Sequence, residues 1–150
     1  MKLDQHFLQL VEETAKLSND PTTNVGAIIL TLDLQVIKAC NHSIGLYEVN
    51  RFKRPEKYKY FEHAERNAIY KAAKYGKSTL DGTMYTHNIP CIECARAIIQ
   101  SGITTVVCYE GYSERWAESQ NQAEELLNEC NIQIRKYEKE KYNKNERNQH

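Results

Sequence analysis

The chain has 150 residues, enough for one domain with a sizeable hydrophobic core. Its 20 basic and 20 acidic side chains cancel, so the basic excess needed for sequence-independent binding is missing and no nucleic-acid partner is expected. No run approaches the roughly 20 apolar residues of a membrane span, and the N-terminus lacks the apolar stretch of a signal peptide. These features predict a cytoplasmic protein whose five cysteines stay reduced.

The first third of the chain predicts one helix and a pair of strands. Residues 3–17 carry apolar side chains at helical spacing, and Pro21 follows as a helix breaker. The short apolar runs at 25–32 and 36–40 are rich in β-branched residues, which predicts two buried strands in a hairpin. Residues 41–61 are polar, aromatic and basic without a clear period. They predict a long loop, and such loops inside compact domains are usually functional.

Helices and strands alternate in the rest of the chain. The predicted elements are a helix at 62–75, a strand at 83–88, a helix at 91–101, a strand at 104–110, a helix at 114–130 and a strand at 132–137. Strands that alternate with helices pair in parallel and are covered on both faces, so the fold class is α/β. From residue 138 nearly every side chain is charged or an amide, which predicts a domain at 1–137 and a frayed tail at 138–150.

Two short motifs carry the candidate chemistry. In "PCIEC", Cys91 and Cys94 lie three residues apart on the first helical turn, so both point the same way. Free amides at a helix N-terminus lower thiol pKa values and favour thiolates. In "HAE", His63 and Glu65 open the preceding helix. Two thiolates and one imidazole suit a tetrahedral Zn²⁺ with an open fourth position, which is typical of a catalytic zinc.

Glu65 suggests what such a site would do. It cannot comfortably bind the ion that His63 binds, but it can reach a water on that ion, whose pKa zinc lowers to about 7. The carboxylate can take the proton and return it to a ring nitrogen and then to a leaving amine. The pattern H-x-E…P-C-x-x-C is the signature of the zinc-dependent nucleobase deaminases. The motifs therefore predict hydrolytic deamination.

The cysteines and histidines also allow other roles. Cys91 and Cys94 could form a redox dithiol, but such a pair usually follows the first strand of a βαβ unit, and here it follows the third predicted strand. They could hold a structural zinc, but its fourth ligand would have to be His87 or Cys108, and neither forms a second spaced pair. Packing or loop positions are predicted for Cys40, Cys108, Cys130, His42 and His87.

Four stretches resemble the deoxycytidylate (dCMP) deaminases of the cytidine deaminase-like superfamily: "NDPTTNVGAIIL", "RPEKYKYFEHAERNAIYKAAKYG", "MYTHNIPCIECARAIIQSGITTVV" and "CNIQIRKY". The resemblance covers residues 5–137 and implies a three-layer α/β/α fold whose five-stranded mixed sheet has the order 2-1-3-4-5. It implies Zn²⁺ on His63, Cys91 and Cys94, with Glu65 as proton shuttle. The implied reaction converts dCMP to dUMP and ammonia, feeding thymidylate synthesis. It also implies a homo-oligomer, often a hexamer in that family.

The resemblance further implies contacts with a deoxycytidine nucleotide. The loop before the first strand lies near the phosphate, the residue after the second strand contacts the sugar, and an aromatic residue after the fourth strand closes over the nucleotide. The implied substrate-binding residues are Thr22, Asn24, Asn41, Ala64 and Tyr112, with Trp116 as the alternative to Tyr112.

The stretch "NHSIGLYEVN" at 41–50 departs from the family's Asn-Gly-x-Pro-x-Gly loop. Many family members are activated by dCTP and inhibited by dTTP through that region, so both this regulation and the number of substrate phosphates stay open. Deamination of dCTP, deamination of tRNA or single-stranded nucleic acid, and a zinc-stabilised module without catalysis are the alternatives. A basic cluster either holds the substrate phosphate or forms a solvated or subunit-facing loop. Its members are Arg51, Lys53, Arg54, Lys57 and Lys59.

Overall fold

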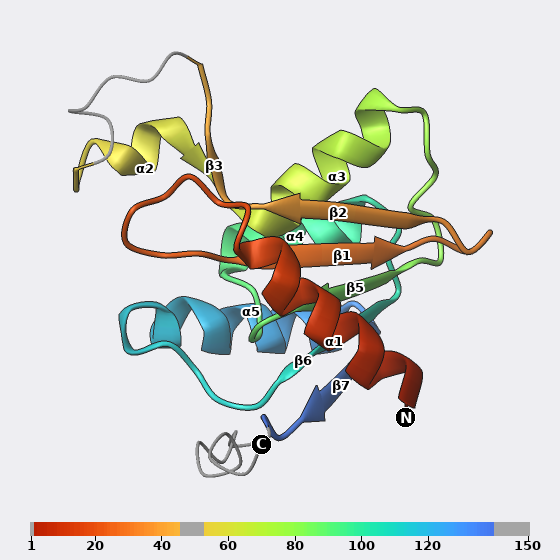
Figure 1. The fold of residues 1–150 in the computed structure, drawn as a ribbon. Helices are drawn as coiled ribbons and strands as arrows, with labels where there is room; N and C mark the ends of the chain where they lie inside the picture. Colours follow the sequence, from red (N-terminus) through yellow and green to blue (C-terminus); the bar gives the residue numbers. More distant parts are fainter. Residues whose placement is uncertain (1, 46–52, 140–150) are drawn as a thin grey trace, which may run out of the picture.

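The computed structural model describes residues 2–45 and 53–139, which form a layered α/β domain (Figure 1). Its central sheet has five strands in the order β2-β1-β5-β6-β7. Strand β1 is antiparallel to β2 and β5, whereas β5, β6 and β7 are parallel. The strands are β1 Gly26–Leu30, β2 Val36–Cys40, β5 Thr83–Thr86, β6 Thr105–Tyr109 and β7 Gln133–Tyr137. Numbered in chain order, this confirms the predicted mixed sheet with order 2-1-3-4-5.

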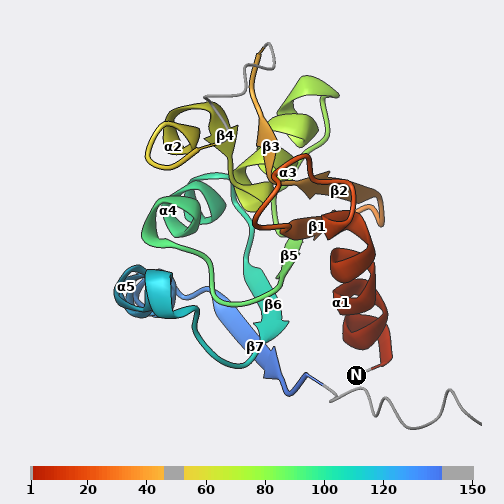
Figure 2. The same ribbon diagram turned by 60° about the vertical axis from the view of Figure 1, so that its left-hand side comes forward.

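Helices cover both faces of the sheet, as predicted, because successive strand residues point to opposite sides. The helices are α1 Lys2–Ala15, α3 Ala64–Lys74, α4 Ile92–Gln100 and α5 Ala117–Glu129. On one face, Ile28 and Tyr85 pack against α1, and on the other, Ile29 and Met84 pack against the remaining helices. Figure 2 shows α1 on one side of the sheet and α4 and α5 on the other. The metal motifs therefore belong to the layer of α3, α4 and α5.

A buried polar cluster fastens α1 to the last strand. Asp4 is completely buried and accepts hydrogen bonds from Arg135 Nε at 2.8 Å, Tyr137 Oη at 2.6 Å and Tyr85 Oη at 3.1 Å. Burial alone would raise the pKa of Asp4, but the hydrogen bonds from Arg135 and Tyr137 outweigh it and lower the pKa below its usual value. The beginning and end of the predicted domain are thus joined by one carboxylate.

The segment at 41–61 differs from the predicted loop. It contains the short helix α2 (Lys57–Tyr60) and two short strands, β3 (His42–Ser43) and β4 (Phe61–Glu62), which pair antiparallel. Two-residue strands and a four-residue helix are too short to show a hydrophobic period, which explains why the sequence pattern missed them. Strand β4 ends directly before His63, so this small sheet sets where α3 begins.

Parts of two predicted features lie outside the described residues. Arg51 of the basic cluster is one of them, and so is the tail from residue 140 onward. Within residues 2–45 and 53–139, no helix has both the length and the apolar composition that a bilayer crossing requires.

Candidate active site

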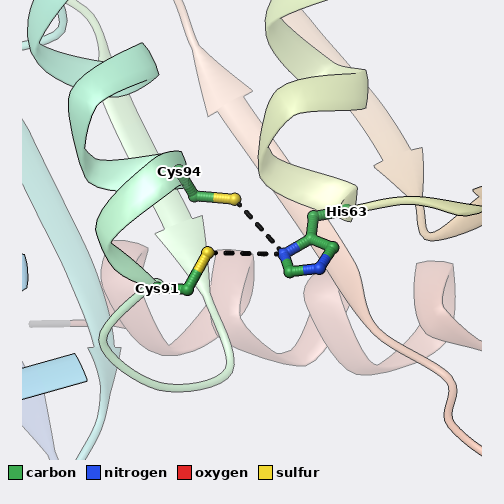
Figure 3. A group of neighbouring side chains, drawn as sticks. All are labelled: His63, Cys91 and Cys94. Atoms are coloured by element: carbon green, nitrogen blue, oxygen red, sulfur yellow. Dashed lines mark hydrogen bonds between the residues drawn. The ribbon is translucent and has the colours of Figure 1, made fainter. Parts of the chain in front are cut away.

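The structure brings His63, Cys91 and Cys94 together, although 28 residues separate the first two in sequence. His63 caps the N-terminus of α3, Cys91 caps that of α4, and Cys94 lies in the first turn of α4. Each Sγ lies 3.5 Å from His63 Nδ1, so the imidazole nitrogen faces both sulfurs (Figure 3). Two helix N-termini therefore converge on one small space between α3 and α4.

The geometry of the three side chains fits Zn²⁺. Tetrahedral coordination with Zn–N near 2.0–2.1 Å and Zn–S near 2.3 Å places a ligand nitrogen and a ligand sulfur about 3.6 Å apart. The two nitrogen–sulfur distances here are 3.5 Å, and the potential ligand atoms all lie within 4.8 Å of one another. Two sulfurs and one imidazole nitrogen form a donor set that zinc prefers over hard cations.

The protonation of the cluster also suits metal binding. The hydrogen bond from Cys94 has the largest effect on Cys91, and the hydrogen bond from His63 adds to it. Together they lower the pKa of Cys91 to about 4, which favours the thiolate at neutral pH. The same pairing with Cys91, together with burial, raises the pKa of Cys94. The hydrogen bond to Cys91 raises the pKa of His63 despite burial. The lowered pKa of Cys91 favours a thiolate ligand, and ligation of a cation would draw the remaining protons off the cluster.

Glu65 faces the same space from the first turn of α3. Its side chain is buried, and Oε2 accepts a hydrogen bond from Cys94 Sγ at 3.6 Å. Burial raises the pKa of the carboxyl, although the nearby His63 opposes the shift. A carboxyl with raised proton affinity beside a metal-ligand cluster is suited to accept and release protons near neutral pH.

A cavity of about 950 Å³ opens beside the cluster. This volume lies near the upper end of the range typical of small-molecule sites. Trp116, at the end of the 3₁₀ helix η2 (Glu114–Trp116), lines it and meets the His63 ring nearly edge-on, with centroids 5.6 Å apart. Tyr58 also lines the cavity and meets Trp116 nearly edge-on, with ring centroids 6.4 Å apart. The cavity thus has an aromatic wall next to the candidate metal ligands.

The predicted substrate-binding residues fall into two groups. Asn24, Asn41 and Ala64 line the cavity, whereas Thr22 and Tyr112 are not among its lining residues. Tyr112 is 44% exposed, and its hydroxyl donates a hydrogen bond to Glu124 on α5. Of the two aromatic candidates, Trp116 is the one at the cavity.

The side-chain amide of Asn41 makes contacts within the protein in addition to lining the cavity. Its Oδ1 accepts the N–H of Val25 at 2.9 Å, and its Nδ2 donates to the carbonyl of Thr23 at 2.8 Å. The side-chain amide is therefore already engaged in shaping the loop before β1. Nothing in the sequence distinguishes such a structural amide from one that faces a ligand, since both are polar residues at a strand end.

Polar residues of α5, which sequence analysis missed, fix the rim of the cavity. Gln120 is buried, accepts the N–H of Ser113 at 2.9 Å and donates to the carbonyl of Ile89 at 2.7 Å. Ser119 Oγ accepts the N–H of Ile92 at 2.9 Å, which satisfies a free amide at the start of α4. Gln120 and Ser119 read in the sequence as ordinary polar positions of an amphipathic helix, so no sequence signal marks them.

The basic cluster does not act as one group. Lys57 is buried against Asp20, Lys59 is exposed and pairs with Glu56, and Arg54 lines the cavity. The structure therefore favours the solvated-loop alternative for Lys59, whereas Arg54 and Lys57 both line the cavity.

Comparisons with known proteins agree with this geometry. Residues 1–110 match the family model described as "Cytidine and deoxycytidylate deaminase zinc-binding region". The chain is 30% identical over 140 residues to the "Uncharacterized deaminase in luxG 3'region" of Aliivibrio fischeri, covering 89% of this chain and 92% of that protein. It is 28% identical over 144 residues to the deoxycytidylate deaminase of Homo sapiens, covering 89% and 78%.

Some relatives extend well beyond the region that aligns with this chain. The chain spans 40% of the deoxycytidylate deaminase of Enterobacteria phage T4, at 38% identity over 82 residues. The crystal structure of dCMP deaminase from cyanophage S-TIM5 in complex with dCMP and dUMP superposes with a TM-score of 0.73 at 20% identity, covering 91% of this chain and 97% of that one, which shows the same fold. On the family match and these relatives, the chain belongs to the cytidine and deoxycytidylate deaminase family.

Proposed function

We propose that the protein is a zinc-dependent hydrolase that converts dCMP to dUMP and ammonia. The observation that carries the proposal is the position of Glu65, whose carboxylate lies 3.6 Å from Cys94 within a cluster of zinc-type ligands. A zinc site that only stabilises the fold has no use for a buried carboxyl at that place. The choice of dCMP is supported by the names of several relatives and by the phage enzyme's complex with dCMP and dUMP.

In this mechanism His63, Cys91 and Cys94 would hold the metal. When bound, Zn²⁺ supplies the Lewis acid that makes water a nucleophile near neutral pH. Glu65 moves the protons: its carboxylate accepts one from the water and delivers it to the pyrimidine ring nitrogen, where it stays in the product, and then accepts a second from the added hydroxyl and delivers it to the amino group, which leaves as ammonia. Burial of Glu65 keeps its proton affinity raised and so suits it to both halves of this transfer.

Trp116 and Arg residues of the cavity would orient the nucleotide. The indole stands beside His63 and offers an aromatic surface to the pyrimidine. Among the described cations that line the cavity, Lys57 and Arg66 are paired with the carboxylates of Asp20 and Glu62. We therefore assign the substrate phosphate to the two others, Arg54 and Arg115.

The experiment is a substrate panel at one salt concentration. Ammonia release by the zinc-loaded protein is measured with dCMP, dCTP, deoxycytidine and a tRNA anticodon stem-loop. We expect dCMP to have the highest kcat/KM. Deoxycytidine should fall by at least about tenfold for each charged hydrogen bond lost with the phosphate, since such bonds contribute about 1.5–3 kcal/mol. A higher value for dCTP would favour the triphosphate alternative, and equal values for deoxycytidine and dCMP would indicate a nucleoside deaminase.

Several expectations stay predictions. They are a deaminase domain at 1–137, a supply of dUMP to thymidylate synthesis, a cytoplasmic homo-oligomer, and control by dCTP and dTTP. The segment to which the family resemblance attaches this control includes residues 46–50, which lie outside the described part of the chain. Activity measured with and without dCTP and dTTP tests the last of these directly.

A further inference from the structure

We propose that Lys57 is a positioning residue that locks two walls of the nucleotide cavity together through a buried ion pair with Asp20, and that it does not bind the substrate phosphate itself. The inference rests on the proposed function. A lysine in a basic loop beside a site for an anionic ligand would first be expected to bind that ligand directly.

The contacts of Lys57 leave it little freedom to reach a ligand. Its Nζ lies 2.8 Å from Asp20 Oδ2 and donates to Thr22 Oγ1 at 3.0 Å. The side chains of Lys57 and Asp20 are only 6% and 3% exposed. Moving the ammonium to a phosphate would leave the Asp20 carboxylate buried without its counter-charge, and uncompensated buried charges are strongly unfavourable. The ammonium of Lys57 is therefore paired with Asp20 inside the protein and is not free to pair with a ligand.

Asp20 links this ion pair to the loop before β1. Its second oxygen, Oδ1, accepts the backbone N–H groups of Thr22 at 2.9 Å and Thr23 at 3.3 Å, which bends the chain into a turn. Asn41 Nδ2 completes the network at 3.4 Å from Asp20 Oδ2. One carboxylate thus shapes the turn with one oxygen and holds Lys57 with the other.

The segment that carries Lys57 depends on this anchor. Helix α2 has four residues, and its N-cap residue, Glu56, makes no side-chain capping hydrogen bond. Helices of this length are not stable alone, so tertiary contacts must hold the segment in place. The residue after Lys57 is Tyr58, which meets Trp116, and Trp116 in turn meets His63. Fixing Lys57 therefore also fixes the aromatic wall beside the candidate metal ligands.

Residues on both sides of the ion pair line the same cavity. Thr23, Asn24 and Val25 come from the turn that Asp20 shapes, and Tyr58 and Phe61 come from the segment that Lys57 carries. Loss of the ion pair should consequently make two parts of the cavity wall more mobile: the turn that Asp20 shapes and the segment that carries Lys57. The expected signature is weaker ligand binding with a smaller effect on kcat, because Glu65 and the metal ligands keep their own supports.

The test uses Asp20→Asn in the zinc-loaded full chain. Asparagine keeps the oxygen that shapes the turn but removes the charge that holds Lys57. A lysine that binds phosphate directly would be freed by this change, and dUMP binding would stay equal or tighten. A positioning lysine would lose its anchor, and the Kd for dUMP should rise by about tenfold, because ligand binding would then have to order the loosened side chains of the cavity wall, at a cost of about two- to tenfold in affinity each. Lys59→Met, an exposed lysine two residues away, is the matched control and should leave the Kd unchanged.

Binding is followed through Trp116, the single tryptophan of the chain. A milder variant, Lys57→Arg, keeps the charge but not the shape that fits the buried slot, and it decides the question if Asp20→Asn does not fold. Weaker dUMP binding by Lys57→Arg supports positioning, and equal or tighter binding overturns it. Acrylamide quenching of Trp116 in the ligand-free variants gives a readout that needs no substrate, and increased quenching is expected. If the wild-type protein does not bind dUMP, the proposed function fails, while the quenching still tests the role of Lys57.

Discussion

Arg66 on α3 donates a hydrogen bond to Glu93 on α4 at 3.0 Å, joining the two helices whose N-termini carry the candidate metal ligands. Arg66 Nε also donates to Glu62 Oε1 at 2.6 Å, and the same oxygen accepts the N–H of His63 at 2.9 Å. Burial works against the charge of this guanidinium, but the electrostatic interaction with the Cys94 sulfur and the hydrogen bond to the Glu62 carboxylate outweigh it and raise the pKa of Arg66. Arg66 therefore ties both helices together and places a positive charge near the thiols.

The first prediction concerns this link. Arg66→Met should weaken zinc binding by about 10- to 100-fold, the usual effect of losing a residue that supports metal ligands from behind. Zinc affinity is measured by competition with a chromophoric chelator. Arg96→Met removes an exposed arginine from α4 and serves as the control. Equal zinc affinities for Arg66→Met and the wild-type protein would show that the link has no role in metal binding.

The second prediction concerns the Asp4 cluster. Asp4→Asn should lower the free energy of unfolding at pH 7 by about 3 kcal/mol, because it leaves Arg135 without its buried partner. The folded-state pKa of Asp4 lies below its ordinary value of 3.8, so this stability is present above that pH and is lost as the pH falls through the folded-state pKa.

Urea unfolding of wild-type and variant proteins at pH 7 and near pH 3 measures this difference, with zinc removed from both so that metal release does not contribute. The gap between the two proteins should narrow at the lower pH. Asp81→Asn, an exposed aspartate, is the control. A gap that stays constant with pH would contradict the assignment of the shift to Asp4.

The third prediction separates the two aromatic residues that sequence analysis left as alternatives. Trp116→Leu should raise the KM for dCMP by about tenfold or more, because base–aromatic contacts contribute about 1–3 kcal/mol. Tyr112→Phe should leave KM nearly unchanged, since the Tyr112 hydroxyl bonds to Glu124 and the residue does not line the cavity. The opposite ranking of the two variants would place Tyr112, not Trp116, over the pyrimidine.

Much of this architecture follows from patterns that are local in the sequence. The β-branched runs at 25–32 and 36–40 predicted the hairpin because strand preference and burial act together there. The predicted strands and helices agree with the observed ones to within a few residues at each end. The two candidate metal motifs were identifiable because their spacings are local: two cysteines lie on one helical turn after a proline, and His-x-Glu stands upstream at the start of its own helix.

Other features depend on tertiary contacts and left no such pattern. The role of Lys57 is decided by Asp20, 37 residues away, and the engagement of Asn41 by backbone groups of another loop. The short strands β3 and β4 form because they pair with each other, since neither has the length to be recognised alone. Sequence reasoning thus named the candidate metal cluster and several residues that line the cavity, but not the tertiary contacts that hold the cavity wall in place.

The most direct test of the deaminase account is the kcat for dCMP of Glu65→Gln compared with the wild-type protein, with zinc content determined on the same samples. Glutamine keeps the size of the side chain but cannot carry a proton. General acid–base catalysis contributes about 10²- to 10⁴-fold, so we expect kcat to fall by at least about 100-fold. Both proteins should hold one zinc per chain and bind dUMP with similar Kd. A variant that retains more than about half of the wild-type kcat, where a general acid–base role predicts a loss of orders of magnitude, would contradict the account.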